Sequence, residues 1–570
     1  MKKLLAILAL LPLACRTNMQ TTNETAAAPP QGRVEVLPGV ELRLRQLPKV
    51  AIDYDRSLLN ENERAVVAKL IEASKFIDEI YWRQVSEQNP QIRKQLAAQV
   101  TRSERDRAGY DYFIANKGRW DRLAQDEPFI APFGTAGHKP EGAAFYPADV
   151  TKEEMERYIT AHPEQKDALQ GLFTVVRRQG DRLVTIPYSV HYREFLEPAA
   201  ARIREAAALT NNASLRSYLT KLADALLKDE YRDSDMAWMD LNGPLEVVIG
   251  PYEVYEDALF NWKAAFQSFI NVVDRPETEK LAIYAQHLPA MERNLPIPDE
   301  HKNPNRGTES PIRVVQEVFT AGDARRGVQT AAFNLPNDEV VREQKGSKKV
   351  LLKNVMDAKF RLSGQPIAMR VLEPSQRGLL NFDAYFNFVL FHELSHGVGP
   401  GLITPPGGGE RTDVRLLLKE TYSSIEECKA DVLGVWNILY AMQDHFLQSS
   451  FNEQQLFATY AGLHFRSMRF GIDEAHGRGT AVQWNWLREQ NAIVPVGDGT
   501  FRVDFARMRP AMQSLATELL MIEATGDYAR AQRLLAKYGV STAEIESVTA
   551  RLKDIPVDIT PYFPAAGETE

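Results

Sequence analysis

His392-Glu393-Leu394-Ser395-His396 brings two imidazoles and a carboxylate into one short stretch of the chain. Residues four apart share one face of a helix, so His392 and His396 can both reach a single Zn²⁺ ion. Glu393, beside the first histidine, then points toward the open coordination position, where it can take a proton from metal-bound water. The stretch predicts a helix that carries the metal site of a hydrolase.

The flanking residues support that helix. Residues 382–391 contain no Pro or Gly and are mostly apolar, as is typical of a buried helix. Gly397, Gly399 and Pro400 follow the second histidine and indicate that the helix stops there. A core helix with two incidental histidines is the alternative interpretation. A catalytic zinc needs a third protein ligand, which has to come from elsewhere in the chain.

Residues 422–431 offer the best candidates for that ligand. They lie in a Gly-poor, Pro-free run from about Asp413 to Phe446, which predicts a second helix. Glu427 and Asp431 are four apart and share a face, with Glu426 next to them. In zinc sites one carboxylate commonly binds the ion while others accept hydrogen bonds from the histidine rings. A solvated acidic helix face is the ordinary alternative, and spacing alone does not choose among the three carboxylates.

HELSH followed about 35 residues later by EECKAD resembles the two zinc motifs of the dipeptidyl peptidase III metallopeptidases. The second motif of that family has the form E-E-C-x-A-(E/D), and its second Glu is the third ligand. The resemblance implies one Zn²⁺ per chain on His392, His396 and Glu427. It also implies that Glu426 and Asp431 orient the two histidines, and that Glu393 is the catalytic base.

Three further segments resemble functional stretches of the same family. Residues 249–255 are similar to a segment whose Glu holds the substrate amino group and whose Tyr stabilises the oxyanion, which implies these roles for Glu253 and Tyr255. Asn334 and Asn337 match an asparagine pair that binds the peptide N-terminus. Glu474-Ala475-His476 is similar to the segment with a catalytic histidine. Taken singly, a packed Tyr, an Asn-containing turn and an ordinary histidine are the competing interpretations.

The zinc motif also differs from that of many family members, whose histidines are five apart. Some bacterial members, and plant proteins that add a Nudix domain, look closer to this chain. The sequence has no Nudix box with a REx₂EE-type core, so pyrophosphohydrolase activity is not supported. The shorter motif leaves metal binding intact, because a spacing of four suits a regular helix.

Composition indicates an ordinary globular protein. The chain has 570 residues, of which 44% are hydrophobic and 25% charged, and its formal net charge is −8. Such a length favours two to four folding units with a large core. The acidic balance and the lack of a basic run give no indication of nucleic-acid binding.

The N-terminus predicts export. Lys2 and Lys3 precede an apolar stretch from Leu4 to Ala14 that ends at Cys15, which is typical of a bacterial lipoprotein signal peptide. We expect lipidation of Cys15 and a membrane-anchored protein in the bacterial periplasm, held by acyl chains alone. Ordinary cleavage, which would leave a soluble periplasmic protein, is the alternative.

Periodicity predicts the following elements. Helices are expected at Glu63–Ser86, Thr151–Ala161, Pro198–Leu227 and Phe260–Leu288, and throughout most of Asn381–Leu552. Strands are expected at Leu245–Tyr255, Ile312–Phe319, Val328–Asn334, Lys349–Val355 and Ile367–Val371. The fold class is therefore α+β and predominantly helical. The family resemblance implies two lobes with a cleft, in which a helical zinc lobe faces a mixed lobe with a small β-barrel.

We divide the chain accordingly into a signal peptide (1–15), a flexible stalk (16–35), the first part of the mixed lobe (36–273), a helical-lobe insertion (274–311), the strand-rich part of the mixed lobe (312–372), the helical zinc-binding lobe (373–555) and a loose tail (556–570). The expected activity is that of a zinc exopeptidase releasing dipeptides from short peptides with a free N-terminus. A zinc aminopeptidase or oligopeptidase with another cutting register, or a peptide-binding lipoprotein with a non-catalytic zinc, are the alternatives.

Overall fold

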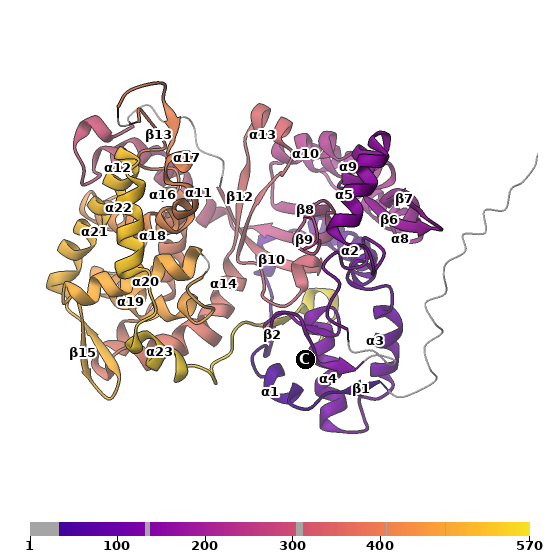
Figure 1. Cartoon of the computed structure of the whole chain (residues 1–570), viewed down its shortest axis with the longest axis horizontal. Coiled ribbons are helices and arrows are strands. Elements are labelled where there is room, and N and C mark those ends of the chain that lie inside the picture. Colours follow the sequence, from indigo (N-terminus) through magenta and orange to yellow (C-terminus); the bar gives the residue numbers. More distant parts are fainter. Residues whose placement is uncertain (1–33, 132–136, 304–311, 406, 474, 570) are drawn as a thin grey trace, which may run out of the picture.

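The structure is a computed structural model that describes residues 34–131, 137–303, 312–405, 407–473 and 475–569. Two lobes lie side by side, with the mixed lobe on the right of Figure 1 and the helical lobe on the left. Residues 275–293 lie with the helical lobe, because Leu281 and Met291 pack into its core. Within these residues no helix is both long enough and apolar enough to span a membrane. The predominantly helical, two-lobed α+β fold is confirmed.

A five-stranded sheet forms the centre of the mixed lobe. Its strands are β8 Leu245–Glu253, β9 Ala265–Val273, β10 Ile312–Gly322, β11 Ala332–Leu335 and β12 Lys348–Leu352, in the order β11-β12-β10-β9-β8. All neighbours are antiparallel except β10 and β12. The sheet remains a half-barrel, because β8 and β11 at its edges do not pair with each other. Among the described residues no strand pairs with the outer edge of β11, which is therefore a free edge.

Helices cover this sheet and supply the rest of the lobe core. α2 Glu61–Val85, α8 Arg193–Leu209, α9 Ala213–Lys228 and α10 Arg232–Met239 are the main ones. The sequence places the start of α2 two residues late, because Asn60 and Glu63 form a capping box that opens the helix at Glu61. Its apolar face, with Val66, Leu70 and Ile77, is fully buried.

Shorter elements complete the mixed lobe. The helices are α1 Val40–Leu44, α3 Asn89–Ala97, α4 Glu104–Asn116, α5 Lys152–Ala161, α6 Lys166–Gln170, α7 Tyr188–His191, α13 Glu339–Lys345 and α14 Lys353–Lys359. The paired strands are β1 Glu35–Val36 with β5 Ile130–Ala131, β3 Trp120–Asp121 with β4 Glu127–Pro128, and β6 Thr174–Gln179 with β7 Arg182–Pro187.

The helical lobe contains α11 Arg275–Gln286, α12 Leu288–Arg293, α15 Gln365–Val371, α16 Phe382–Ser395, α17 Val414–Leu418, α18 Tyr422–Gln443, α19 Glu453–Met468, α20 Ala475–Glu489, α21 Phe505–Thr525, α22 Tyr528–Tyr538 and α23 Ala543–Ala550. Two hairpins join them, β13 Leu402–Ile403 with β14 Thr412–Asp413, and β15 Ile493–Gly497 with β16 Thr500–Val503. α16 and α18 lie at its centre (Figure 1).

Two element predictions are wrong. The first half of the predicted helix Phe260–Leu288 contains the strand β9, whose residues are all buried, so apolar and polar side chains do not alternate along it. The predicted strand Ile367–Val371 is the helix α15, whose Ile367, Ala368 and Val371 pack into the helical-lobe core. A short apolar run does not distinguish these two structures by periodicity.

Three domain limits also differ from prediction. The stalk ends before residue 35, because Glu35–Val36 already forms β1. The end of segment 312–372 belongs to the helical lobe, since α15 packs in that core. The tail is held in place: β17 Thr560–Tyr562 pairs in parallel with β2 Lys49–Ala51, and Arg325 holds Glu568 at 2.6 Å. The prediction followed from the position of these residues at the end of the chain, and the C-terminus lies against the mixed lobe (Figure 1).

Candidate metal centre

Two glycines let three helices of the helical lobe approach one another closely. A Cβ at Gly434 on α18 would lie 3.1 Å from the backbone nitrogen of His392 on α16. A Cβ at Gly479 on α20 would lie 3.1 Å from the backbone nitrogen of Cys428 on α18. Both contacts are tighter than ordinary packing, so glycine permits these crossings at the predicted metal ligands. Sequence reasoning missed both residues, because a helical Gly by itself carries no such signal.

The three predicted zinc ligands lie together where α16 and α18 cross. The Nε2 atoms of His392 and His396 are 3.1 Å apart. Oε2 of Glu427 is 3.5 Å from the first of these nitrogens and 3.9 Å from the second. One donor atom from each residue thus lies within 4.8 Å of the others, a group that could hold a metal ion.

The hydrogen bonds of the two rings favour a cation between them. Nδ1 of His392 donates to Asp431 and Nδ1 of His396 donates to Glu426, each at 2.8 Å. In the neutral rings both Nε2 atoms then carry lone pairs that face each other, which is unfavourable without a shared cation. Oε2 of Glu427 is buried and accepts no hydrogen bond. This His₂Glu donor set fits the three protein ligands of a catalytic Zn²⁺.

The carboxylates that accept hydrogen bonds from the two histidine rings are themselves held in place by other side chains. Gln483 on α20 donates to Asp431 at 2.8 Å, and Tyr460 donates to Gln483 at 2.6 Å. Burial raises the pKa of Asp431, but the hydrogen bonds from His392 and Gln483 outweigh it and keep that pKa below its ordinary value. The carboxylate therefore stays ionised and fixes the ring orientation. Sequence reasoning missed Gln483 and Tyr460, which are brought here only by helix packing.

Glu426 has a comparable partner from its own helix. Lys429 approaches Glu426 at 2.9 Å with i,i+3 spacing, and it also donates to the carbonyl of Val398 at 3.2 Å. Burial raises the pKa of Glu426, but the charge of Lys429 and the contact with His396 lower that pKa by a larger amount. The net shift is therefore downward. The lysine within EECKAD could have been identified from this spacing.

Glu393 lies beside the metal group and faces the other lobe. Its carboxylate is 3.1 Å from the ammonium of Lys349 on β12. Burial raises the pKa of Glu393, but Lys349 and the two histidines lower it by more, so the group stays ionised as a base must be. Sequence reasoning missed Lys349, since nothing local connects β12 with α16.

His476 begins α20 near the same group. Its Nε2 is 3.3 Å from Oε2 of Glu427, and 62% of its side chain is exposed. An exposed ring beside a metal ligand is accessible to a substrate as well as to the metal site. Glu474, quoted with it in the sequence motif, lies outside the described residues.

A cavity of about 230 Å³ joins this group to the mixed lobe. Its lining includes His392, Glu393 and His476 from the helical lobe, and Ala331 and Ala332 at the start of β11. The metal group therefore opens into the cleft beside the free edge of the sheet. Cofactor and substrate sites are commonly placed between lobes in this way.

Three of the four mixed-lobe candidates, Glu253, Tyr255 and Asn337, line a separate cavity of about 730 Å³. Glu253 ends β8, whereas Tyr255 lies in the turn beyond it and is 70% exposed, so the strand stops two residues before the predicted end at Tyr255. Asn334 is exposed on the edge strand β11 and lines neither this cavity nor the metal cavity. None of these four residues lines the metal cavity.

Glu256 anchors the turn that carries Tyr255. It is fully buried and lies 2.7 Å from Lys139 and 2.9 Å from Arg122, and it accepts a hydrogen bond from Tyr81. Burial raises the pKa of Glu256, but the surrounding cations lower it by much more. The buried contacts of Glu256 thus hold the turn in place, while Tyr255 faces solvent.

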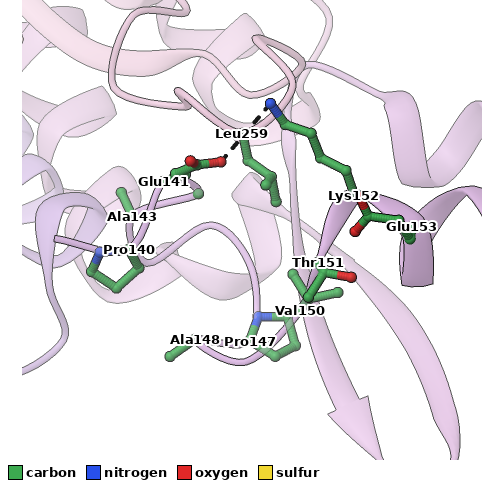
Figure 2. A pocket seen from close by; sticks show the side chains of 11 residues that line it. Pro140, Glu141, Ala143, Pro147, Ala148, Val150, Thr151, Lys152, Glu153 and Leu259 are labelled. Carbon is green, nitrogen blue, oxygen red and sulfur yellow. Dashed lines mark ion pairs between the residues drawn. The ribbon is translucent and has the colours of Figure 1, made fainter. Parts of the chain in front are cut away.

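A third cavity, of about 430 Å³, lies in the mixed lobe between residues 140–153 and Leu259. Figure 2 shows Glu141 and Lys152 forming an ion pair there, with their charged atoms 3.9 Å apart. The remaining lining is mostly small or apolar, and none of the predicted site residues belongs to it. We assign this cavity no chemistry.

Comparison with known proteins gives an independent line of evidence. The profile of Peptidase family M49 matches residues 150–415. The solved structure of DPP III from Caldithrix abyssi is similar with 48% identity and a TM-score of 0.86, covering 92% of this chain and 98% of that one. Dipeptidyl-peptidase III from Corallococcus sp. strain EGB is similar with 40% identity and a TM-score of 0.74, covering 94% and 98%.

Two curated proteins are also similar to this chain, and one of them is named a dipeptidyl peptidase. Nudix hydrolase 3 of Arabidopsis thaliana is 36% identical over 92% of this chain and 74% of its own length. Human dipeptidyl peptidase 3 is 23% identical over 62% of this chain and 54% of its own length. Near-complete matches to two solved peptidases, together with the matched family profile, establish the relationship that the zinc motifs predicted. The chain belongs to the dipeptidyl peptidase III family, peptidase family M49, and is a hydrolase of the dipeptidyl-peptidase class.

Proposed function

We propose that this protein uses one zinc ion to release dipeptides from the free N-terminus of short peptides. The observation that carries the proposal is the buried Oε2 of Glu427, which accepts no hydrogen bond from the described residues and faces two imidazole nitrogens beside an ionised Glu393. A structural zinc has no need of a general base next to it. This pairing of ligands with a base supports a catalytic role.

His392, His396 and Glu427 would hold the ion, which when bound would polarise the scissile carbonyl and acidify the attacking water. Glu393 would accept a proton from that water and later deliver one to the leaving amine. The lowered pKa of Glu393 keeps its carboxylate ionised, which is the form that accepts a proton. His476 is near enough to the ligand set to donate toward negative charge that develops on the carbonyl oxygen.

The mixed lobe would set the cutting register. Burial and the nearby Asp323 raise the pKa of Glu253, so its charge is poorly compensated and would gain from a substrate ammonium. Asn334 and Asn337 would hold the same end of the peptide, and Tyr255 would stabilise the oxyanion. Because these residues lie outside the metal cavity, we propose that the lobes close on the peptide.

The test compares free and N-acetylated peptides of four to ten residues, using zinc-loaded protein and Glu393→Ala as control. Mass spectrometry should show successive loss of dipeptides from the free peptides alone, and none with the variant. Single residues or internal fragments would favour an aminopeptidase or oligopeptidase. Binding of peptide and zinc without any cleavage by the wild type would favour a peptide-binding lipoprotein.

We further propose that the protein is exported and anchored through a lipid on Cys15. The support is the sequence pattern alone, since residues 1–33 lie outside those described. Metabolic labelling with a radioactive fatty acid should label the wild type but not Cys15→Ser. Labelling of both, or of neither, would contradict the anchor.

A further inference from the structure

Lys349 reaches from one lobe to the other. It lies on β12, directly opposite Asn334 of the edge strand β11. Opposite residues of an antiparallel pair place their side chains on the same face of the sheet. Asn334 and Lys349 therefore share the face from which Lys349 contacts α16, although the two side chains come from different strands.

The ammonium of Lys349 makes two contacts with a single residue. It lies 3.1 Å from the carboxylate Oε2 of Glu393 and donates to the backbone carbonyl of the same residue at 3.1 Å. Holding both ends of Glu393 restricts its side-chain torsions as well as its charge. A single cation thus fixes the direction in which the carboxylate points.

Neighbouring lysines do not make this connection. Lys345 pairs with Asp240 and Lys348 pairs with Glu246, and all four residues belong to the mixed lobe. Lys349 has only intermediate exposure, so its contact with Glu393 is partly protected from solvent screening. The ion pair from the sheet to α16 is therefore specific to this position among the three.

We propose that Lys349 on the mixed lobe is a positioning residue that orients the general base Glu393 on the helical lobe. The inference rests on the proposed function. Because an ion pair of this kind needs nitrogen and oxygen within about 4 Å, separation of β12 from α16 would release the carboxylate. The base is therefore held in this orientation only while β12 lies against α16.

The experiment compares the holoenzyme with Lys349→Met, which keeps the length of the side chain but removes its charge, and Lys349→Arg, which keeps the charge. Lys345→Met is the matched control, because it removes a lysine ion pair that stays within one lobe. We expect Lys349→Met to lower kcat by about 10- to 100-fold, as loss of an orienting partner typically does. KM and zinc content should stay unchanged, Lys349→Arg should restore most of kcat, and the control should match the wild type.

An unchanged or increased kcat in Lys349→Met would overturn the proposal, as would equal losses in the Met and Arg variants or a loss of zinc. A double-mutant cycle with Glu393→Gln, read from urea denaturation midpoints, needs no activity. Non-additive midpoints are expected for a coupled pair, and additive midpoints would contradict it. If the wild type fails to cleave any peptide, the proposed function fails, while the cycle still decides whether Lys349 holds Glu393.

Discussion

The two lobes carry their site residues in different ways. In the helical lobe, His392, His396 and Glu427 lie within a few ångström of one another, and each histidine ring is already fixed by a carboxylate. In the mixed lobe, Tyr255 and Asn334 are exposed, and neither lines the metal cavity. The metal ligands are assembled within a single packed core, whereas we propose that the mixed-lobe site is completed when a peptide binds.

This difference follows from what each part has to do. A metal ligand set must be rigid, because a small displacement of a ligand weakens coordination. A peptide must enter and leave the other surface, so its binding groups stay accessible until the cleft closes. Substitutions in the first region should therefore affect chemistry and metal affinity, and those in the second should affect substrate binding.

The largest effect should come from the base. Glu393→Gln removes the proton acceptor but keeps the shape of the side chain, so kcat should fall by about 10²- to 10⁴-fold with zinc retained. Steady-state kinetics and elemental analysis of the same preparation measure both quantities. Residual activity close to that of the wild type would remove Glu393 from the mechanism and leave the helical-lobe site without a catalytic group.

Removing the charge of Glu256 should test how firmly the exposed region is anchored. Glu256→Gln leaves buried cations unpaired and should lower the free energy of unfolding by about 3–5 kcal/mol at pH 7. Its pKa is lower in the folded state, so the stabilisation is present above the unfolded pKa of about 4.3 and disappears as the pH falls through the folded value. Urea denaturation between pH 7 and pH 3 should show the beginning of this loss in the wild type but not in Glu256→Gln.

The exposed pair of Glu141 and Lys152 provides the control for that measurement. Glu141→Gln should change the free energy of unfolding by no more than about 1 kcal/mol, since surface ion pairs contribute little. Equal effects of the two substitutions would show that the buried cluster does not stabilise the mixed lobe.

A smaller effect, on zinc affinity, is expected for the carboxylate that orients His392. Asp431→Asn removes the charged acceptor of His392 and should weaken zinc binding about 10- to 100-fold, with little change in fold. Competition with a zinc chelator measures the affinity. Asp444→Asn, at the far end of α18, is the matched control and should bind zinc like the wild type.

The mixed lobe should respond through substrate binding. Glu253→Gln should raise KM for free peptides about 10- to 100-fold, the equivalent of one charge-assisted hydrogen bond, and leave zinc affinity unchanged. Kinetics on a peptide with a free amino group, alongside isothermal titration with zinc, separates the two. A change in zinc affinity with an unchanged KM would contradict the assignment of substrate binding to the mixed lobe and metal binding to the helical lobe.

The metal centre could be predicted because its ligands follow a helix period. His392 and His396 are four apart, as are Glu427 and Asp431, so each pair projects from one face whatever the rest of the fold does. The crossing of the helices could not be predicted in this way. It depends on Gly434 and Gly479, whose role appears only when the neighbouring backbone is in place.

Elements buried on all sides were harder to predict. β9 is buried along its whole length and α15 is a short apolar segment, so neither shows the alternation that separates strand from helix. Lys349 lies 44 positions from Glu393, and only the contact between β12 and α16 makes it a partner of the base. The tail was likewise predicted loose because its pairing with β2 joins opposite ends of the chain.

The most direct test of the account is anomalous X-ray scattering at the zinc edge from crystals of the zinc-loaded protein. The account predicts one strong peak between α16 and α18, about 2.0–2.2 Å from both Nε2 atoms and a carboxylate oxygen of Glu427. No peak there, or a zinc ion held by other residues, would contradict the metal centre and the peptidase mechanism that depends on it.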